Sequence, residues 1–356
     1  MDKNDKPYLI AGPCSVESRE QLQTVVRALC AIPQVKAIRC GVWKPRTRPG
    51  GFEGLGEPAL QWMKELADSP LCMADGSPLR FCCEVARPEH VELCRQYGIA
   101  TVWLGARTTA NPFMVEELSE ALKDSPMRVL VKNPLNPDVR LWLGAIERLQ
   151  KCGVRDIMAI HRGFSMYHNS GYRNAPLWEV AMEFRREQPS IPILCDPSHM
   201  GGRRELVESL SSAAMKLDYD GLMIEVHPHP ADALTDAPQQ ITPDELIHLA
   251  TKIIDTLRQR HDLIPAPLST ALAALRSEID SVDHAMLRML AHRMDLSRQI
   301  ATLKSQSQMS VYQAKRWEEV LQNRLSLADE LGLSPSFTKE LLDKIHAESV
   351  RIQMEE

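Results

Sequence analysis

Six cationic side chains stand at or just beyond the ends of short apolar runs in the first half of the chain. They are Arg39, Lys44, Arg46, Arg107, Lys132 and Arg162. Taken singly, an Arg or Lys in such a place is more often a solvated loop residue. If the fold brings all of them to one pocket, their mutual repulsion requires anions to fill it. The pattern then predicts a small substrate pair that carries several phosphate or carboxylate groups.

A second set of side chains has the chemistry of metal ligands. Its members are Cys14, His199, Glu225 and Asp236. A thiolate, an imidazole and two carboxylates suit a divalent transition metal, and the sulfur and nitrogen donors argue against Mg²⁺ or Ca²⁺. Two alternatives stay open at this point: Cys14 could be a buried core residue, and Glu225 could pair with a neighbouring arginine.

The segments that carry both sets alternate between strand-like and helical patterns. The strand-like runs cover residues 8–15, 37–43, 79–86, 100–105, 128–132, 156–161, 191–195 and 221–226. Most are continuously apolar, as in parallel strands that are buried on both faces. Eight strand–helix units predict an α/β fold, a (β/α)₈ TIM barrel whose chemistry lies at the carboxyl ends of the strands. A doubly wound sheet is the alternative, although the first strand-to-helix turn has no GxGxxG loop.

The composition changes near residue 260. Of the 17 Gly, only Gly332 follows Gly221, while apolar residues recur at helical spacing from Leu272 onward. We expect a barrel domain at 1–262, a linker at 263–268 and a small all-α domain at 269–356, with helices at 269–305, 313–331 and 335–353. The first helix is too long for so small a domain to cover alone. A homodimer through this domain is therefore expected, with a tetramer as the alternative.

The remaining composition narrows the class of protein. The chain is 44% hydrophobic and 25% charged with a formal net charge of −5, which excludes disorder and offers no basic surface for nucleic acid or membrane. A polar N-terminus and the lack of a long apolar run predict a cytoplasmic protein. Nine cysteines without a disulfide-like spacing agree with reduced thiols in that compartment.

Motifs in the first 260 residues resemble those of the type I 3-deoxy-D-arabino-heptulosonate-7-phosphate (DAHP) synthases. The motifs are GPCSVES, KPRT, GAR, VLVKNP, HRGF, DPSH, IEVHPHP and LTDAPQQ. The resemblance covers roughly residues 7–260 and implies a (β/α)₈ barrel that joins phosphoenolpyruvate to erythrose 4-phosphate. That reaction opens the shikimate pathway of aromatic amino acid biosynthesis. The KPRT form differs from the corresponding loop of octulosonate-phosphate synthases, although another aldose phosphate stays open as the acceptor.

The resemblance assigns roles by position. It implies that the metal ligands are Cys14, His199, Glu225 and Asp236, with Mn²⁺ as the expected ion and Co²⁺, Fe²⁺ or Zn²⁺ as alternatives. It implies that phosphoenolpyruvate is held by Arg39, Lys44, Arg107, Lys132 and Arg162. The phosphate of erythrose 4-phosphate would contact Arg46 and Thr47, and Asp196 would lie near the sugar hydroxyls. The catalytic residues would include Lys44, Cys14 and His199, with Glu84 near the pocket.

The C-terminal region resembles the AroQ-type chorismate mutases, which are all-helical and convert chorismate to prephenate. The resemblance rests on LRSEID and the cations after it, and the matched positions are Arg276, Arg293, Lys304, Arg316, Ser349 and Gln353. It implies that these residues bind the two carboxylates of chorismate and the ether oxygen of the transition state, which is electrostatic catalysis. Lys304 and Gln353 would be the catalytic pair at the ether oxygen, and Arg276 would act across the dimer.

Two positions depart from the better-known bacterial mutases. Trp317 stands where they carry Glu, and Gln313 stands where some have Asp, positions that usually contact the substrate hydroxyl or its surroundings. The whole chain thus resembles a bifunctional fusion, and related fusions use the mutase domain to sense prephenate or chorismate and inhibit the synthase. The alternative is a helical domain that only senses ligand and dimerises.

Overall fold

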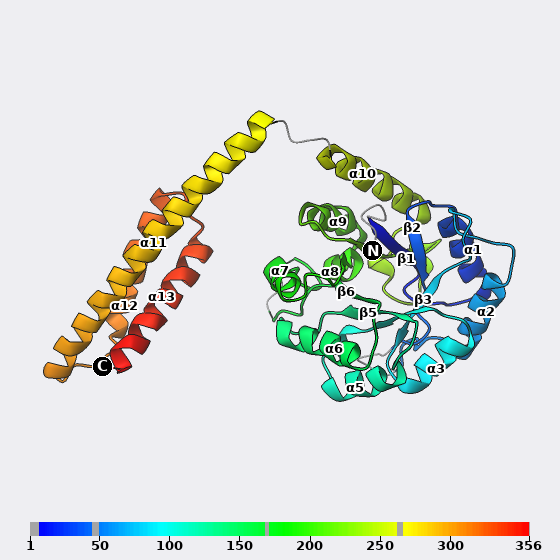
Figure 1. Cartoon of the computed structure of the whole chain (residues 1–356), viewed down its shortest axis with the longest axis horizontal. Coiled ribbons are helices and arrows are strands. Elements are labelled where there is room, and N and C mark those ends of the chain that lie inside the picture. Colours follow the sequence, from blue (N-terminus) through cyan, green and yellow to red (C-terminus); the bar gives the residue numbers. More distant parts are fainter. Residues whose placement is uncertain (1–6, 45–49, 168–170, 262–265, 356) are drawn as a thin grey trace. The chain divides into compact units, whose positions relative to one another are not determined.

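The computed structural model describes residues 7–44, 50–167, 171–261 and 266–355 (Figure 1). It divides the chain into two compact units, Met1–Asp262 and Leu263–Glu356. The first is built of strands and helices, and the described part of the second is entirely helical. In the described ranges, no helix is both long enough and apolar enough to cross a membrane.

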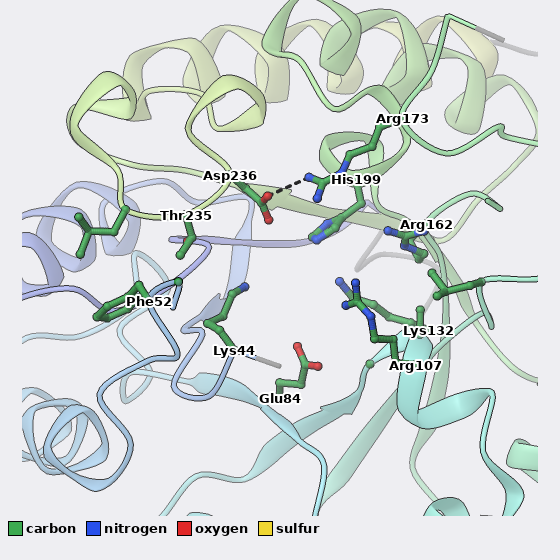
Figure 2. Close-up of a pocket in the computed structure, with 15 residues that line it drawn as sticks. Lys44, Phe52, Glu84, Arg107, Lys132, Arg162, Arg173, His199, Thr235 and Asp236 are labelled. Carbon is green, nitrogen blue, oxygen red and sulfur yellow. Dashed lines mark hydrogen bonds and ion pairs between the residues drawn. The ribbon is translucent and has the colours of Figure 1, made fainter. Parts of the chain in front are cut away.

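Eight parallel strands form a closed barrel in sequence order. They are β1 (Tyr8–Gly12), β2 (Val35–Arg39), β3 (Phe81–Val85), β4 (Thr101–Leu104), β5 (Arg128–Lys132), β6 (Ile157–His161), β7 (Ile193–Cys195) and β8 (Gly221–Glu225). β1 pairs with β8 along its length, which closes the sheet. The predicted (β/α)₈ barrel is therefore confirmed, and the doubly wound alternative is wrong. A cavity opens beyond the carboxyl ends of the strands (Figure 2).

Helices connect successive strands or follow the last one, and they cover the barrel (Figure 1). They are α1 (Arg19–Cys30), α2 (Glu57–Ala67), α3 (Pro88–Gln96), α4 (Ala106–Thr109), α5 (Pro112–Ala121), α6 (Val139–Lys151), α7 (Trp178–Glu187), α8 (Pro197–Gly201), α9 (Val207–Lys216) and α10 (Pro243–His261). Several begin at a side chain that accepts hydrogen bonds from free backbone N–H groups, as Asp138 does for α6.

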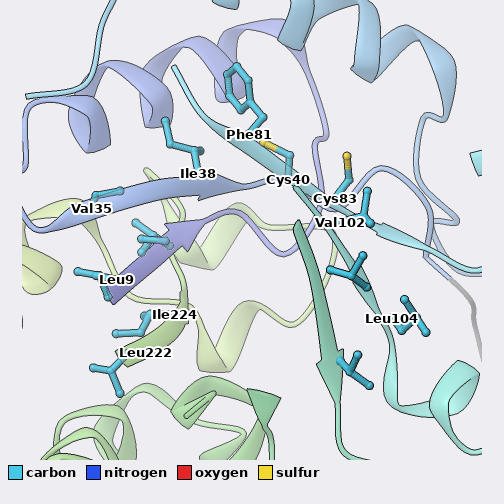
Figure 3. Close-up of a cluster of buried hydrophobic side chains, with 14 of the residues drawn as sticks. Leu9, Val35, Ile38, Cys40, Phe81, Cys83, Val102, Leu104, Leu222 and Ile224 are labelled. Atoms are coloured by element: carbon cyan, nitrogen blue, oxygen red, sulfur yellow. The ribbon is translucent and has the colours of Figure 1, made fainter. Parts of the chain in front are cut away.

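Alternate residues of each strand enter two different apolar layers. On β1, Leu9 packs under the surrounding helices and Ile10 points into the barrel. On β3, Cys83 belongs to the outer layer, which Figure 3 shows, and Cys82 to the inner one. The inner layer also contains the large ring of Trp103. The barrel interior is thus a packed core up to its carboxyl end, where the residue types change.

The helical unit contains α11 (Ala266–Gln306), α12 (Ala314–Glu330) and α13 (Pro335–Glu355), and α13 packs against both others. Within the expected linker at 263–268, residues 266–268 belong to α11, and residues 263–265 lie outside the described ranges. Pro267 does not prevent this, because a first-turn residue needs no N–H for an intrahelical bond. At 41 residues, α11 spans about 61 Å.

Candidate active sites

The charged residues of the barrel occupy the inward-facing positions just above the inner apolar layer. On β5, inward-facing Leu130 is followed two residues later by Lys132, and on β8 the same step leads from Met223 to Glu225. Because side chains alternate with a period of two, this step keeps the inward orientation. The same step from inner apolar residues of other strands gives Arg39, Glu84, Arg162 and Asp196.

Glycine takes this position on the two remaining strands. A Cβ atom at Gly105 would lie 2.2 Å from Oε1 of Glu84, and one at Gly12 would lie 2.1 Å from the carbonyl oxygen of Arg39. Both distances are far shorter than the closest approach of two non-bonded atoms in a packed core. The two glycines therefore leave the space that the charged layer occupies.

A cavity of about 550 Å³ lies above this layer, and side chains of both signs line it (Figure 2). Its cations are Lys44, Arg107, Lys132, Arg162 and Arg173. The first four were predicted from the sequence and are brought together here. Arg173 was not predicted. Burial lowers the pKa of Arg162 to about 10, and the charges of Arg173 and Arg107 act in the same direction. A bound anion would relieve that repulsion, so the cavity suits anionic ligands.

Arg39, expected to contact a substrate, is 1% exposed and lies below the cavity. Its Nη2 is 3.0 Å from Oε1 of Glu225, and its guanidinium lies 5.2 Å from the centre of the Trp103 ring. Among the described atoms, Nη1 of Arg39 is buried without a hydrogen bond. The arginine that could pair with Glu225 is thus present, and it does not exclude a metal role for that carboxylate.

Three of the four predicted metal ligands form a tight cluster. The candidate donor atoms of Cys14, Glu225 and Asp236 all lie within 4.8 Å of one another. His199 is beside them, with Nε2 3.7 Å from Oε1 of Glu225. That oxygen is buried and, apart from the ion pair with Arg39, has no hydrogen bond among the described residues. It can accept a second cation, and the donor set fits a divalent transition metal.

The protonation states agree with this fit. Burial raises the pKa of the Cys14 thiol to about 12, and the negative charge of Glu225 adds to the effect. The thiol needs a nearby cation to ionise, and a bound metal provides one. Burial also lowers the pKa of His199, which keeps the imidazole in the neutral form that metals bind.

Asp196, expected near sugar hydroxyls, is fully buried behind residues that line the cavity. Its Oδ2 lies 2.8 Å from Nδ1 of His199 and 2.9 Å from Nζ of Lys132. Its Oδ1 accepts a hydrogen bond from the backbone N–H of His199. The structure therefore gives Asp196 the geometry of a positioning group for His199 and Lys132, because both of its oxygens are already engaged.

The segment that carries Asp236 is fixed to the end of β1 by hydrogen bonds. The N–H of Cys14 donates to the side chain of Gln240 (3.0 Å), and Ser15 and Thr235 hydroxyls lie 2.6 Å apart. Arg173 donates to Oδ1 of Asp236 (2.9 Å), as Figure 2 shows. Asp236 itself has a left-handed backbone (φ 50°). These contacts aim its carboxylate at Cys14 from far along the chain. Arg46 and Thr47 lie outside the described residues.

The helical unit brings four of its six predicted residues together in two pairs. Lys304 of α11 donates to Oε1 of Gln353 (3.1 Å) and to the carbonyl oxygen of Val311 (2.6 Å). Arg293 of α11 donates to the hydroxyl of Ser349, which precedes Gln353 by one turn on α13. The two pairs therefore share one face of α13.

The other two predicted cations of this unit lie apart from the cluster. Arg316 is largely exposed and pairs with Glu319 at 3.3 Å. Arg276 is exposed on the first half of α11. Several apolar residues of that half are exposed as well, including Leu275 and Ile279 at 59% each. Within the described residues of one chain, nothing covers this stripe.

Comparisons with known proteins agree with this division. Residues 1–261 match the model of the DAHP synthetase I family, and residues 275–354 match that of chorismate mutase type II. A phospho-2-dehydro-3-deoxyheptonate aldolase of Thermotoga maritima is 32% identical over 252 residues, or 70% of each chain. A 2-dehydro-3-deoxyphosphooctonate aldolase of Rickettsia bellii is 25% identical over 276 residues, or 70% of this chain and 92% of its own.

Solved structures give the same picture for the barrel. The crystal structure of a Thermotoga maritima phospho-2-dehydro-3-deoxyheptonate aldolase has a TM-score of 0.61 at 29% identity and covers 71% of this chain and 69% of its own. A truncated 3-deoxy-D-arabino-heptulosonate 7-phosphate synthase from the same organism has a TM-score of 0.60 at 28% identity, covering 73% and 92%.

Proposed function

Since the chain belongs to the DAHP synthetase I family and also contains a chorismate mutase type II domain, we propose that it catalyses two reactions of aromatic biosynthesis. The barrel condenses phosphoenolpyruvate with erythrose 4-phosphate to DAHP and phosphate. The helical unit converts chorismate to prephenate. Both families agree with the prediction made from the sequence motifs.

One observation carries the barrel proposal: a cavity lined by five cations lies against a cluster of metal-type donors. Phosphoenolpyruvate and erythrose 4-phosphate are both anions and repel each other in water. Arg107, Lys132 and Arg162 bind the phosphate and carboxylate groups and hold the two substrates together, which is a proximity effect. Arg46 and Thr47 take the phosphate of the aldose.

Cys14, His199, Glu225 and Asp236 are the proposed metal ligands. A divalent ion held there, with Mn²⁺ preferred over Co²⁺, Fe²⁺ or Zn²⁺, supplies Lewis-acid polarisation of the aldehyde oxygen. Asp196 keeps His199 oriented toward that site through the contact at 2.8 Å.

Lys44 joins the ligand cluster to the cavity. Its Nζ lies 3.0 Å from Sγ of Cys14, and the residue lines the cavity wall. Burial opposes its charge, but Cys14 and Glu225 outweigh that effect and raise its pKa. Lys44 therefore keeps its proton and places a positive charge beside the reacting carbonyl and the substrate carboxylate.

The identity of the acceptor is tested by phosphate release from phosphoenolpyruvate. The full chain should consume phosphoenolpyruvate with erythrose 4-phosphate and not with arabinose 5-phosphate. The opposite preference would assign the barrel to octulosonate-phosphate synthesis, the activity named for the more distant relative.

The mutase proposal rests on the shared face of Arg293, Lys304, Ser349 and Gln353. Arg293 binds a carboxylate of chorismate, and Lys304 with Gln353 stabilises negative charge on the ether oxygen as its bond breaks. Arg276 completes the site from the second copy of a homodimer, with Arg316 at the opening. Chorismate loss, followed by absorbance, should be measurable for the full chain and fall at least about 100-fold in Lys304→Ala.

The alternative is a helical unit that senses ligand without turnover. It would be favoured if the full chain bound prephenate but left chorismate unchanged. We propose that the unit both turns over chorismate and mediates feedback, so that prephenate inhibits the synthase. Inhibition should disappear in Arg293→Ala while uninhibited synthase activity stays.

The nine cysteines are all free, which agrees with a cytoplasmic enzyme.

A further inference from the structure

His346 and Trp317 form an aromatic pair beside the Arg293 and Lys304 cations. The two rings are stacked, with centroids 3.9 Å apart and planes inclined by 8°. Trp317 belongs to α12 and His346 to α13, so the stack fixes the imidazole between two helices. Tyr312 adds a third ring, 6.0 Å from the imidazole. The orientation of the histidine is thus set by packing on its flat face.

His346 lies on the same face of α13 as the proposed substrate-binding groups. It precedes Ser349 by one turn and Gln353 by two. Arg293, which donates to Ser349, also donates to the carbonyl oxygen of Ile345, the neighbour of His346 (3.4 Å). A substrate held by Arg293 would therefore lie within reach of the imidazole.

The imidazole has an unused polar atom and no charge at neutral pH. Its Nε2 is buried and has no hydrogen-bond partner among the described residues. Burial lowers the pKa of His346. The positive charges of Arg293 and Lys304 lower it further, and the negative charge of Asp343 opposes them. A buried ring nitrogen without a partner is unfavourable unless a ligand supplies one. Trp317 cannot accept a hydrogen bond from this nitrogen, because the indole ring offers only a donor.

On the proposed mutase function, we propose that His346 contacts the ring hydroxyl of the substrate, with Trp317 as its positioning residue. Arg293, Lys304 and Arg276 of the second copy suit the two carboxylates and the ether oxygen of chorismate. The hydroxyl is the remaining polar group, and it is neutral. A neutral imidazole can exchange a hydrogen bond with a hydroxyl without attracting a third carboxylate.

Two substitutions separate this contact from the stack. His346→Phe keeps a ring on Trp317 and removes the nitrogen, whereas His346→Gln keeps a polar amide and removes the ring. The proposal predicts that the Phe variant loses about 10-fold in kcat/KM for chorismate and the Gln variant loses less. The reverse order would overturn it, because a purely structural stack favours Phe. His248→Phe, an exposed histidine of α10, is the matched control and should change nothing.

A substrate analogue without the ring hydroxyl gives the sharper readout. The wild-type chain and His346→Phe should handle this analogue equally, and a penalty that persists would overturn the contact with the hydroxyl. Synthase activity in the same samples reports that the chain is folded. If the wild-type chain shows no chorismate turnover, the mutase proposal fails. In that case the Kd for prephenate is measured for each variant, and His346→Phe should again lose more than His346→Gln. Equal affinities of all variants would overturn the contact.

Discussion

At the scale of single residues, most of the barrel site follows from strand periodicity. Lys132 and Glu225 were predictable because each continues the inward face of an apolar run by one step of two residues. Arg173 was not, because it comes from the loop between β6 and α7 and marks no strand end. Among the described residues, Gly202 is the one whose type reflects the position of Arg173, because a Cβ on Gly202 would lie 2.5 Å from the Cβ of Arg173.

The role of Asp196 was also beyond sequence reasoning. Its position at the end of β7 indicated a group facing the site, but not that Lys132 and His199 would occupy both oxygens. Contacts with other elements, here β5 and α8, decide whether a charged residue meets the ligand or another side chain. Such contacts have no signature in the order of residues along one strand.

Replacing Asp196 by Asn should impair the synthase through its neighbours. The substitution keeps the shape but leaves Lys132 without a counter-charge and weakens the orientation of His199. We expect metal affinity and synthase kcat/KM to fall by roughly 10- to 100-fold. Chorismate turnover by the same protein serves as an internal control and should stay. Asp138→Asn at the start of α6 is the matched variant, because Asn caps a helix equally well. Full synthase activity in Asp196→Asn would contradict the positioning role.

At the scale of elements, the strands were predicted more reliably than the helices. Buried parallel strands are continuous apolar runs, so all eight were found, although the first was expected to reach residue 15 and ends at Gly12. The starts of helices α2 and α7 could not be predicted from the sequence in the same way. Neither begins at a side chain that caps it; Gly56 and Leu177 precede them with positive φ angles of 65° and 36°. Without a capping residue, the sequence does not mark where these amphipathic helices begin.

Gly12→Ala should destabilise the barrel. The added Cβ would approach the backbone of Arg39 on β2, which cannot move without disturbing the sheet. We expect a loss of at least about 2 kcal/mol in the free energy of unfolding, measured by urea with tryptophan fluorescence. Gly144→Ala is the control: within α6 it meets only the flexible end of Arg148 and should stabilise by about 0.5–1 kcal/mol. Equal effects of the two variants would refute the steric role of Gly12.

At the scale of the whole molecule, the chain joins a compact barrel unit to a helical unit that exposes an apolar stripe. The change in composition near residue 260 predicted this division. The start of α11 at Ala266 was not predicted, because Pro267 was expected to lie outside the helix and instead fits its first turn. The exposed stripe at Leu275, Ile279 and Val282 is the physical reason to expect a second copy.

A charge in this stripe should separate the proposed dimer. Ile279→Glu would bury a carboxylate in an apolar interface, so we expect monomers by light scattering and a loss of chorismate turnover, because Arg276 acts from the partner. Ser277→Glu, on the opposite side of α11, is the control and should keep both. A dimer that persists in Ile279→Glu would place the interface elsewhere.

We propose that one chain holds a metal-dependent synthase site and a metal-independent mutase site. One purified sample, assayed for both reactions before and after EDTA treatment and again after Mn²⁺ addition, tests it directly. Phosphate release from phosphoenolpyruvate and erythrose 4-phosphate should vanish with EDTA and return with Mn²⁺, while chorismate turnover stays constant throughout. Synthase turnover that survives metal removal, or mutase turnover that disappears with it, would contradict the assignment of the two sites.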